Sequence, residues 1–261
     1  MKNVIILGSG RSGTSMVGGT LSSAGYFMGD HLVEARDSNP KGFFESRQVN
    51  NLNEQIMSGV VEQRAAGLEN VRCDVPMPKQ LWLARVPVGR RPHVTPDTAR
   101  QIEAMCQRTP FCYKDPRFCY TLSAWRPFLD RRQTVFVCVF RDPSSTVRSI
   151  CKEVAGARYL QNLSISPERA LSVWTTMYSH VLETHQSDGQ WLFLHYHQLL
   201  CEEGLDRLEA FVNAPVDRSF PEARLERNLP DQATTGEASD VYDQLCELAG
   251  YEADTGLQHA A

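Results

Sequence analysis

Residues 4–15, with the sequence VIILGSGRSGTS, constrain the fold of this chain more than any other segment. The four consecutive apolar residues at their start are typical of a buried strand in a parallel sheet. The glycines that follow allow a tight turn, because glycine accepts backbone conformations that other residues avoid. Beyond Gly13 the pattern suits the first turns of a helix. A strand, a glycine-rich loop and a helix in this order predict a nest of backbone N–H groups that favours an anion, above all a phosphate.

Two general nucleotide-binding motifs match this loop. Gly8, Gly10 and Gly13 form the G-x-G-x-x-G fingerprint of dinucleotide-binding proteins, and Asp30 lies about where the ribose-binding acid is expected. The loop also matches most of the Walker A motif, but Thr14 stands in place of its lysine. Without that lysine the main contact to the β- and γ-phosphates is lost, so hydrolysis of ATP or GTP is not expected.

Composition and length are those of an ordinary globular protein. The 261 residues are 42% apolar and 22% charged, and no internal linker divides them, so we expect a single domain over residues 1–261. A formal charge of −4 argues against a nucleic-acid-binding coat and against a polybasic membrane surface. No apolar run approaches the length of a membrane span, and no signal peptide is expected.

The cysteine pattern indicates thiols without a metal. The eight cysteines form no C-x-x-C pair and show no zinc-ligand spacing. Several, including Cys138, lie in apolar segments, where a cysteine is usually a small buried hydrophobe. We therefore expect reduced thiols, a cytoplasmic location and no bound metal.

Apolar segments alternate with helical patterns along most of the chain. Five of these segments are predicted as strands, at residues 4–7, 26–28, 111–114, 134–140 and 191–195. This alternation predicts an α/β, P-loop-like three-layer fold with a central, mostly parallel five-stranded sheet flanked by helices. The proline-rich residues 69–96 read as a solvated loop by default, and residues 60–110 as a cap or insert at an acceptor site. Residues 253–261 are expected to form a frayed tail.

A second motif begins at the end of the most apolar segment, in VFVCVFRDPSSTVRSI. Arg141 ends this predicted strand, where ligands of parallel sheets collect, and Ser149 follows eight residues later. Asp142 suits the N-cap of the next helix and Pro143 its first position. Asp142 also imitates a Walker B acid, although capping explains it more simply.

Together these motifs resemble those of the sulfotransferases that use 3′-phosphoadenosine 5′-phosphosulfate (PAPS), in a bacterial-type, cytosolic form. The loop GSGRSGTS resembles their 5′-phosphosulfate loop, and Arg141 with Ser149 resembles their 3′-phosphate segment. Residues 113–116, YKDP, are similar to the Lys-Asp-Pro of tyrosylprotein sulfotransferases. NPKGFFE at residues 39–45 and WLFLHYHQLL at residues 191–200 match further family segments. The resemblance covers roughly residues 1–215.

The resemblance implies a set of binding and catalytic residues. Lys114 and Arg11 are expected to stabilise the charge that develops on the leaving oxygen. Glu45 is the leading candidate for the base that takes the acceptor proton, with Asp30, His31, Glu34 and Asp115 as alternatives. The residues expected to bind the donor are Gly10, Arg11, Ser12, Gly13, Thr14, Ser15, Arg141, Ser149 and Tyr196. The family's C-terminal contact to the 3′-phosphate has no clear match, although Arg224 or Arg227 are weak substitutes.

The implied function is transfer of a sulfuryl group from PAPS to an acceptor hydroxyl by in-line displacement, without a metal. The alternatives are a P-loop nucleotide kinase-like protein and a dinucleotide-binding protein. The acceptor stays open among carbohydrates, lipids, phenols and other small molecules, and no nucleic acid or membrane span is expected. The oligomeric state is equally open.

Overall fold

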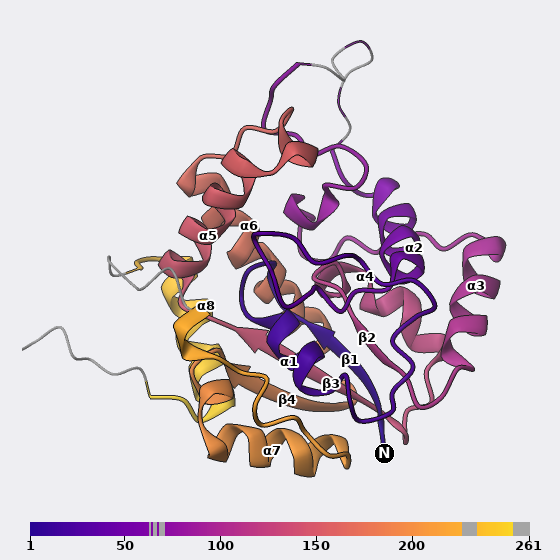
Figure 1. The fold of residues 1–261 in the computed structure, drawn as a ribbon. Coiled ribbons are helices and arrows are strands. Elements are labelled where there is room, and N and C mark those ends of the chain that lie inside the picture. The colour runs from indigo at the N-terminus through magenta and orange to yellow at the C-terminus, as the bar shows by residue number, and fades with distance from the viewer. Residues whose placement is uncertain (63, 65–66, 68–70, 226–233, 253–261) are drawn as a thin grey trace, which may run out of the picture.

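A parallel four-stranded sheet forms the centre of the fold (Figure 1). The computed structural model describes residues 1–62, 64, 67, 71–225 and 234–252, so the predicted tail lies outside the described residues. The strands are β1 (Asn3–Leu7), β2 (Cys112–Lys114), β3 (Thr134–Phe140) and β4 (Gln190–His195), in the order β2-β1-β3-β4. Ile5 of β1 pairs with Tyr113 of β2 on one side and with Phe136 of β3 on the other. The prediction of an α/β fold with a parallel sheet is confirmed.

The prediction of a strand at residues 26–28, which would have made five, is wrong. Phe27 makes an isolated parallel bridge to Phe111, and the chain leaves the sheet on both sides of it. Gly25 and Gly29 flank this bridge with φ angles of 91° and 124°, in the left-handed region. Two such turns four residues apart leave room for one bridging residue rather than a strand.

Each face of the sheet packs against its own set of helices. Val4 and Ile6 face a core that includes Val17 of α1 (Thr14–Thr20) and Leu208 of α7 (Glu202–Val212). Ile5 and Leu7 point the other way, since successive side chains of a strand alternate. That second core is closed by α2 (Arg47–Ser58), α3 (Pro96–Cys106), α4 (Phe118–Trp125), α6 (Pro167–His180) and α8 (Glu237–Ala249).

Local signals set several of the helix starts. The Asp142 carboxylate accepts a hydrogen bond from the Ser145 N–H at 2.8 Å, and Pro143 opens α5 (Pro143–Gly156), as the sequence predicts. Ser166 caps α6 in the same way, by accepting from the Arg169 N–H at 3.2 Å. The Asp142 cap begins α5 directly after the carboxyl end of β3, and the Ser166 cap begins α6.

The proline-rich segment is not a solvated loop along its whole length. Leu81–Leu83 form a 3-10 turn whose side chains are all buried, and Ala84 and Val86 are buried after it. The Tyr120 hydroxyl donates to the Ala84 carbonyl at 3.0 Å, and the His180 ring bonds the Val86 carbonyl at 2.7 Å. The default expectation fails here because the segment carries its own apolar residues into a core beside α5 and α6.

The thiols behave as the sequence predicts. All eight cysteines are free. Burial raises the pKa of the Cys119 thiol to about 12, so it remains protonated and packs as an apolar group. In the part of the chain that is described, no helix combines the length and apolar character that crossing a membrane requires.

Candidate functional site

The glycine-rich loop leaves β1 with a backbone shaped by its neighbours. Gly13 has a φ of 98°, and a Cβ added there would lie 2.7 Å from Cδ2 of Tyr196. Arg11 also lies in the left-handed region, with a φ of 73°, which is uncommon for a residue with a side chain. Beneath the loop, the Tyr178 hydroxyl accepts from the Ser9 N–H at 3.0 Å and donates to the Val139 carbonyl at 2.7 Å. The Tyr196 ring and the Tyr178 hydroxyl therefore both fix the position of the loop.

Arg11 connects this loop to α5. Its Nε donates to the Ser149 hydroxyl at 3.1 Å, and one terminal nitrogen donates to the Ser38 carbonyl at 2.9 Å. Its other terminal nitrogen lies 3.9 Å from a carboxylate oxygen of Glu153, and the Ser38 hydroxyl donates to the same carboxylate at 3.2 Å. Arg11 is therefore hydrogen-bonded to Ser149, one of the residues expected to bind the 3′-phosphate. Ser12 and Thr14 of the loop are buried.

Arg141 approaches the loop from the end of β3. Its guanidinium lies 4.6 Å from the centre of the Tyr196 ring, a cation–π arrangement, and Arg141 is 6% exposed. Because the Tyr196 ring also packs against Gly13, it joins the glycine-rich loop to the second motif. Two segments that are far apart in the chain meet at this ring.

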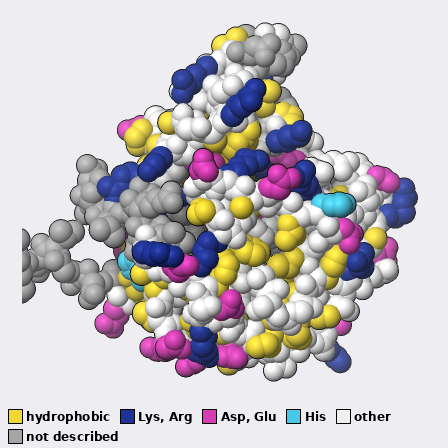
Figure 2. All heavy atoms as spheres, viewed as in Figure 1, with side chains coloured by type: hydrophobic (Ala, Val, Ile, Leu, Met, Phe, Trp, Pro, Cys, Tyr) yellow, Lys and Arg dark blue, Asp and Glu magenta, His cyan; other side chains and the backbone are white. Residues whose placement is uncertain are grey.

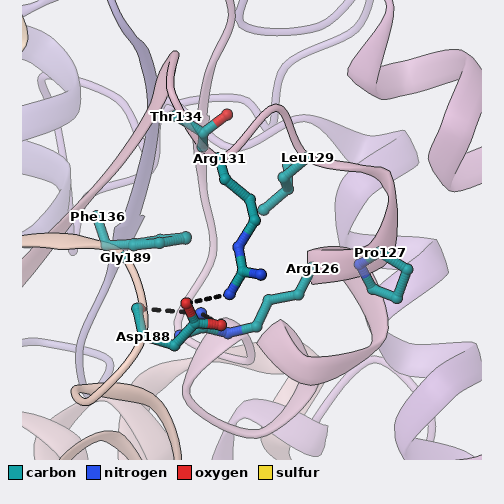
Figure 3. A pocket seen from close by; sticks show the side chains of 8 residues that line it. All are labelled: Arg126, Pro127, Leu129, Arg131, Thr134, Phe136, Asp188 and Gly189. Atoms are coloured by element: carbon teal, nitrogen blue, oxygen red, sulfur yellow. Dashed lines mark hydrogen bonds and ion pairs between the residues drawn. The ribbon is translucent and has the colours of Figure 1, made fainter.

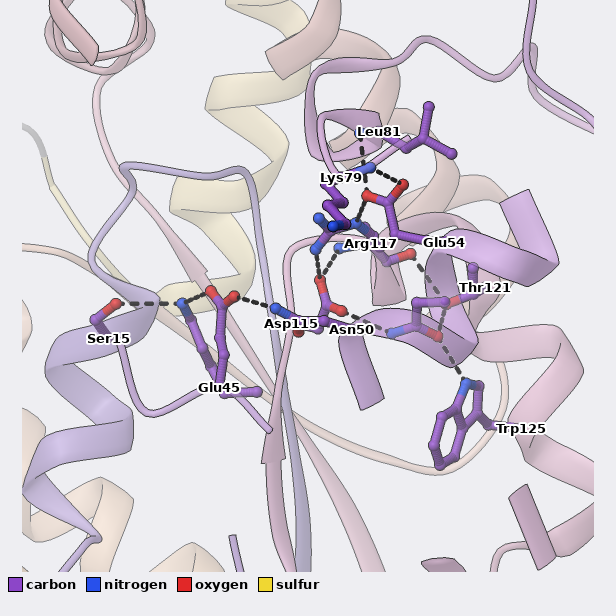
Figure 4. A network of polar contacts seen from close by, with 12 residues as sticks. Ser15, Glu45, Asn50, Glu54, Lys79, Leu81, Asp115, Arg117, Thr121 and Trp125 are labelled. Atoms are coloured by element: carbon purple, nitrogen blue, oxygen red, sulfur yellow. Dashed lines mark hydrogen bonds and ion pairs between the residues drawn. The ribbon is translucent and has the colours of Figure 1, made fainter. Parts of the chain in front are cut away.

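The second cluster of predicted residues surrounds Lys114 at the end of β2 (Figure 4). The Lys114 ammonium forms a short ion pair with Glu45 and donates to the Ser15 hydroxyl at 3.2 Å. The other Glu45 oxygen accepts from the Asn50 amide at 2.8 Å. Burial alone would raise the pKa of the Glu45 carboxyl, but the charges of Lys114 and Arg117 lower it below its usual value. Glu45 is therefore ionised at neutral pH.

Phe44 directs Glu45 toward this cluster. Its φ of 54° is a strained, left-handed conformation for a bulky residue, of the kind that concentrates at functional sites. Its ring packs edge-to-face on Phe220, with the ring centres 5.4 Å apart, and a Cβ added to Gly18 would lie 2.9 Å from the Phe44 Cβ. This packing offsets the strain and fixes the backbone just before Glu45.

Asp115 belongs to a neighbouring network with a different character (Figure 4). One of its oxygens accepts from the Arg117 guanidinium and from the Arg117 N–H, both at 2.9 Å, and the other accepts from the Asn53 amide at 3.0 Å. Arg117 also donates to Glu54 at 2.6 Å, and the Asn53 oxygen accepts from Trp125 at 2.8 Å. The network links α2, α4 and the segment between them.

The remaining candidate bases lie apart from Lys114. Asp30, His31 and Glu34 are exposed and line an open groove beside α2. Asp30 pairs with Arg108 at 3.3 Å, and Glu34 with Arg47 at 2.8 Å. The structure thus brings Glu45, Lys114 and Ser15 together. Asp30, His31 and Glu34 lie on the surface instead.

A second cavity, of about 330 Å³, lies at the opposite edge of the sheet (Figure 3). It is lined by Thr134 and Gly189, at the amino ends of β3 and β4, and by Asp188, which pairs with Arg126 and Arg131. Ligands of parallel sheets bind at the carboxyl ends of strands, so this cavity lies at the opposite end of the strands from the glycine-rich loop.

Of the two weak candidates for a C-terminal phosphate contact, Arg224 pairs with Glu222, and Arg227 lies outside the described residues.

Several contacts of the site were not predicted. Glu153 follows Ser149 by four residues on α5, so helical spacing was a usable signal for it. Trp82 packs on the loop, since a Cβ added to Gly10 would lie 2.4 Å from its ring, and the apolar run LWL was the signal there. Asn50 and Tyr178 carried no signal, because nothing in their own segments distinguishes them from other helical polar residues. Among the described residues, no group of three His, Cys, Asp or Glu side chains is arranged to hold a metal.

Comparisons with known proteins bear on the fold and the family of this chain. A solved sulfotransferase domain from the curacin biosynthetic pathway superposes with a TM-score of 0.53 at 14% identity, over 96% of this chain and 98% of that chain. A sulfotransferase domain from the Synechococcus PCC 7002 olefin synthase gives a TM-score of 0.48 at 15% identity, over 97% of each chain. At such identities the first of these supports the fold alone. No match is found among curated protein sequences. The model of the sulfotransferase family matches residues 3–217, which is most of the chain, and the protein therefore belongs to the sulfotransferase family.

Proposed function

We propose that this protein transfers a sulfuryl group from PAPS to an acceptor hydroxyl. The observation that carries the proposal is the hydrogen bond between Arg11 Nε and the Ser149 hydroxyl at 3.1 Å. It joins the glycine-rich loop to α5, so that the two phosphate motifs of the sequence form one site. The kinase-like alternative lacks the Walker A lysine, which Thr14 replaces, and in the structure Asp30, the candidate ribose-binding acid, pairs with Arg108.

The residues around the loop fit a donor with phosphates at both ends of its ribose. The loop N–H groups, Ser12, Thr14 and Ser15 would hold the 5′-phosphosulfate, because the first N–H groups of a helix have no partner within it. Arg141 and Ser149 would hold the 3′-phosphate, and Arg11 donates to Ser149 from the loop. When bound, this donor supplies the activated sulfuryl group.

Lys114 and Glu45 have the charges that the transfer requires. The Lys114 ammonium would stabilise the negative charge that builds on the leaving oxygen. Glu45 would accept the proton of the acceptor hydroxyl. The charge of Lys114 keeps the Glu45 pKa low, so the carboxylate is ionised and able to accept a proton. The ion pair holds both side chains beside the hydroxyl of Ser15 on the loop.

Asp115 is a poorer candidate for the base. Both of its oxygens already accept hydrogen bonds, and its side chain is fully buried between Arg117 and Asn53. Asp30, His31 and Glu34 are accessible, but their contacts lie with Arg108, Arg47 and the groove instead of with Lys114. We therefore keep Glu45 as the proposed base.

We also propose a reducing, cytoplasmic location, in which the eight cysteines would stay thiols.

Thermal unfolding with different nucleotides tests the proposed donor. We expect adenosine 3′,5′-bisphosphate to raise the Tm, because a ligand at a hundredfold excess over its Kd stabilises a protein by about 2.7 kcal/mol. NADH, and ATP with magnesium, should leave the Tm unchanged. A rise with NADH alone would favour the dinucleotide fingerprint, and a magnesium-dependent rise with ATP would favour a kinase-like protein.

A further inference from the structure

Glu45 stands one residue before the N-cap of α2, and Asn50 is the fourth residue of that helix. The cap is Ser46, whose hydroxyl accepts from the Val49 N–H at 3.4 Å and whose carbonyl accepts from the Asn50 N–H at 2.9 Å. Such a helix start brings the residue before the cap and the fourth helical residue together, and both are often apolar. Here they are a carboxylate and an amide, which form a hydrogen bond of 2.8 Å instead of an apolar contact.

The Glu45 carboxylate depends on other side chains for its orientation. Figure 2 shows Lys, Arg, Asp and Glu side chains interspersed on the surface of the loop between α1 and α2, but Glu45, at the end of that loop, is 9% exposed. Buried polar groups are held by hydrogen bonds within the protein. The last torsion of a glutamate side chain is otherwise broad and poorly defined.

Two donors on different oxygens define this torsion (Figure 4). Lys114 bonds Oε1, and Asn50 Nδ2 donates to Oε2 at 2.8 Å. With Lys114 alone, the three N–H donors of the ammonium could bond either oxygen or both. An ionised carboxylate has about four acceptor positions, so among the described residues about two remain open for the proton of an incoming hydroxyl.

The Asn50 amide is poorly satisfied for a residue that only supports the fold. Because an ionised carboxylate only accepts, the amide faces it with Nδ2. Its Oδ1 is then buried and accepts no hydrogen bond from any described residue. A buried acceptor without a partner costs stability. Such costs are typical of groups that are placed for function.

The titratable groups that interact with Glu45 come from two parts of the described chain. Lys114 and Arg117, at the end of β2 and shortly after it, carry the positive charges that lower its pKa. Tyr159 lies on the 3-10 turn Arg158–Leu160, and burial raises its pKa to about 12, so it stays neutral. The Asn50 amide is uncharged at any pH. A charge introduced at Asn50 would therefore act directly on Glu45.

We propose that Asn50 is a positioning residue, which holds the Glu45 carboxylate in one orientation for the sulfuryl transfer. The inference rests on the proposed function and deepens it. In the reaction, the acceptor oxygen forms a bond to sulfur while the bond from sulfur to the 5′-phosphate oxygen breaks. Adenosine 3′,5′-bisphosphate leaves with the bonding electron pair. The hydroxyl proton goes to an open position on the Glu45 carboxylate.

Turnover of Asn50 variants tests this role, with PAPS and the acceptor that gains SO₃ from a pool of carbohydrate, lipid and phenol hydroxyls. Asn50→Ala should lower kcat about ten- to a hundredfold, because a misplaced catalytic group costs up to about that much. Affinity for adenosine 3′,5′-bisphosphate, measured by calorimetry, should stay within about twofold, because ground-state binding is not altered. In the Glu45→Gln background, the same change should lower kcat by less than about twofold, since a residue that acts through Glu45 then has nothing to position.

The pH profile gives a readout that a structural role would not move. Asn50→Asp keeps the shape of the side chain but places a second carboxylate beside Glu45, and like charges raise a carboxyl pKa. The acidic limb of kcat should therefore move to higher pH by about one unit or more. Asn51, the next residue of α2, is exposed and provides the matched control. Asn51→Ala should change neither kcat nor the pH profile.

Several results would overturn this inference and leave the sulfotransferase function intact. They are an effect of Asn50→Ala that adds fully to that of Glu45→Gln, an unmoved acidic limb in Asn50→Asp, and a loss of bisphosphate affinity in Asn50→Ala. Unchanged turnover in Glu45→Gln would overturn it as well, because Glu45 would then not be the base. If the unmodified protein transfers SO₃ to no acceptor of the pool and does not bind the bisphosphate, the proposed function itself is overturned.

Discussion

Lys114 and Asp115 are neighbours in the chain, yet their side chains enter two different buried ionic clusters (Figure 4). Asp115 is enclosed by Arg117 and Asn53, and both of its oxygens have partners. Lys114 instead bonds Glu45 and the hydroxyl of Ser15 on the glycine-rich loop, where a ligand would arrive. Lys114 is the last residue of β2 and Asp115 is the next residue, so one step along the chain separates a fully bonded ionic cluster from the cluster that we propose for the chemistry.

The difference shows why burial of charge alone does not identify a catalytic group. Both clusters contain a carboxylate beside a cation, and both are shielded from water. The two clusters differ in what the cation contacts besides its first carboxylate. Arg117 donates to Glu54, which in turn accepts from the backbone N–H groups of Lys79 and Leu81. Lys114 instead donates to Ser15 of the glycine-rich loop.

The largest effect is expected from Glu45→Gln. This variant keeps the shape of the side chain but removes its basicity, so kcat should fall by about 10²–10⁴-fold. Affinity for adenosine 3′,5′-bisphosphate, measured by calorimetry on the same preparation, should stay nearly constant. If turnover remains within a few-fold of the unmodified protein, Glu45 is not the base. If nucleotide binding is lost as well, its role is structural.

Asp115→Asn should act on stability instead of on chemistry. The change leaves the buried Arg117 guanidinium without the charge of one of its two carboxylate partners. Removing one member of a buried ion pair costs about 3–5 kcal/mol, which urea unfolding would measure. The kcat per folded molecule should change little. A loss of kcat as large as that of Glu45→Gln would erase the distinction between the two clusters.

A smaller effect, confined to one ligand, is expected from Arg141→Ala. Hydrogen bonds to charged groups contribute about 1.5–3 kcal/mol, so affinity for adenosine 3′,5′-bisphosphate should fall roughly ten- to a hundredfold. Adenosine 5′-phosphosulfate, which lacks the 3′-phosphate, should bind as before. Arg100, exposed on α3 and paired with Asp97, offers a control in Arg100→Ala. Equal losses for both ligands would show that Arg141 supports the fold and does not read the 3′ group.

The pH dependence should be the most subtle difference. The pKa of Glu45 is lowered in the folded protein, so the ion pair stabilises the fold above the unfolded pKa, about 4.3, and this stability disappears as pH falls through the folded pKa. The difference in Tm between the unmodified protein and Glu45→Gln should therefore shrink below about pH 4.3. Turnover should show no acidic limb near pH 6.5, where an ordinary histidine base would produce one. Such a limb would argue for a histidine as the base.

The sequence predicted those parts of the fold that depend on local signals. The uniformly apolar β1 and β3 and the Asp142 cap were readable, because each follows from an apolar run or from a capping residue. The whole of α4 was missed, since Phe118–Trp125 is buried on nearly every side and shows no polar face to set a helical period. The extra strand near Phe27 was predicted from its apolar residues, and the glycines on either side limited it to one bridge.

The site was readable to the extent that its residues belong to motifs. Lys114, Arg141 and Ser149 stand at strand ends or at a fixed helical spacing from one, so their positions follow from the sequence pattern alone. Their partners could not be predicted in the same way. Helical spacing marks Glu153 and the apolar run LWL marks Trp82, but no local pattern shows that Trp82 contacts Gly10 or that Glu153 contacts Arg11 and Ser38. The groove beside α2 likewise exists only where three separate segments meet.

The transfer itself is the most direct test of the proposed function. The protein is incubated with PAPS and pooled hydroxyl acceptors of the carbohydrate, lipid and phenol classes, and both products are followed by mass spectrometry. We predict that one acceptor gains the mass of a single SO₃ group and that adenosine 3′,5′-bisphosphate appears in equal amount. A bisphosphate signal without a modified acceptor, or an acceptor that gains a phosphoryl group from ATP instead, would contradict the account.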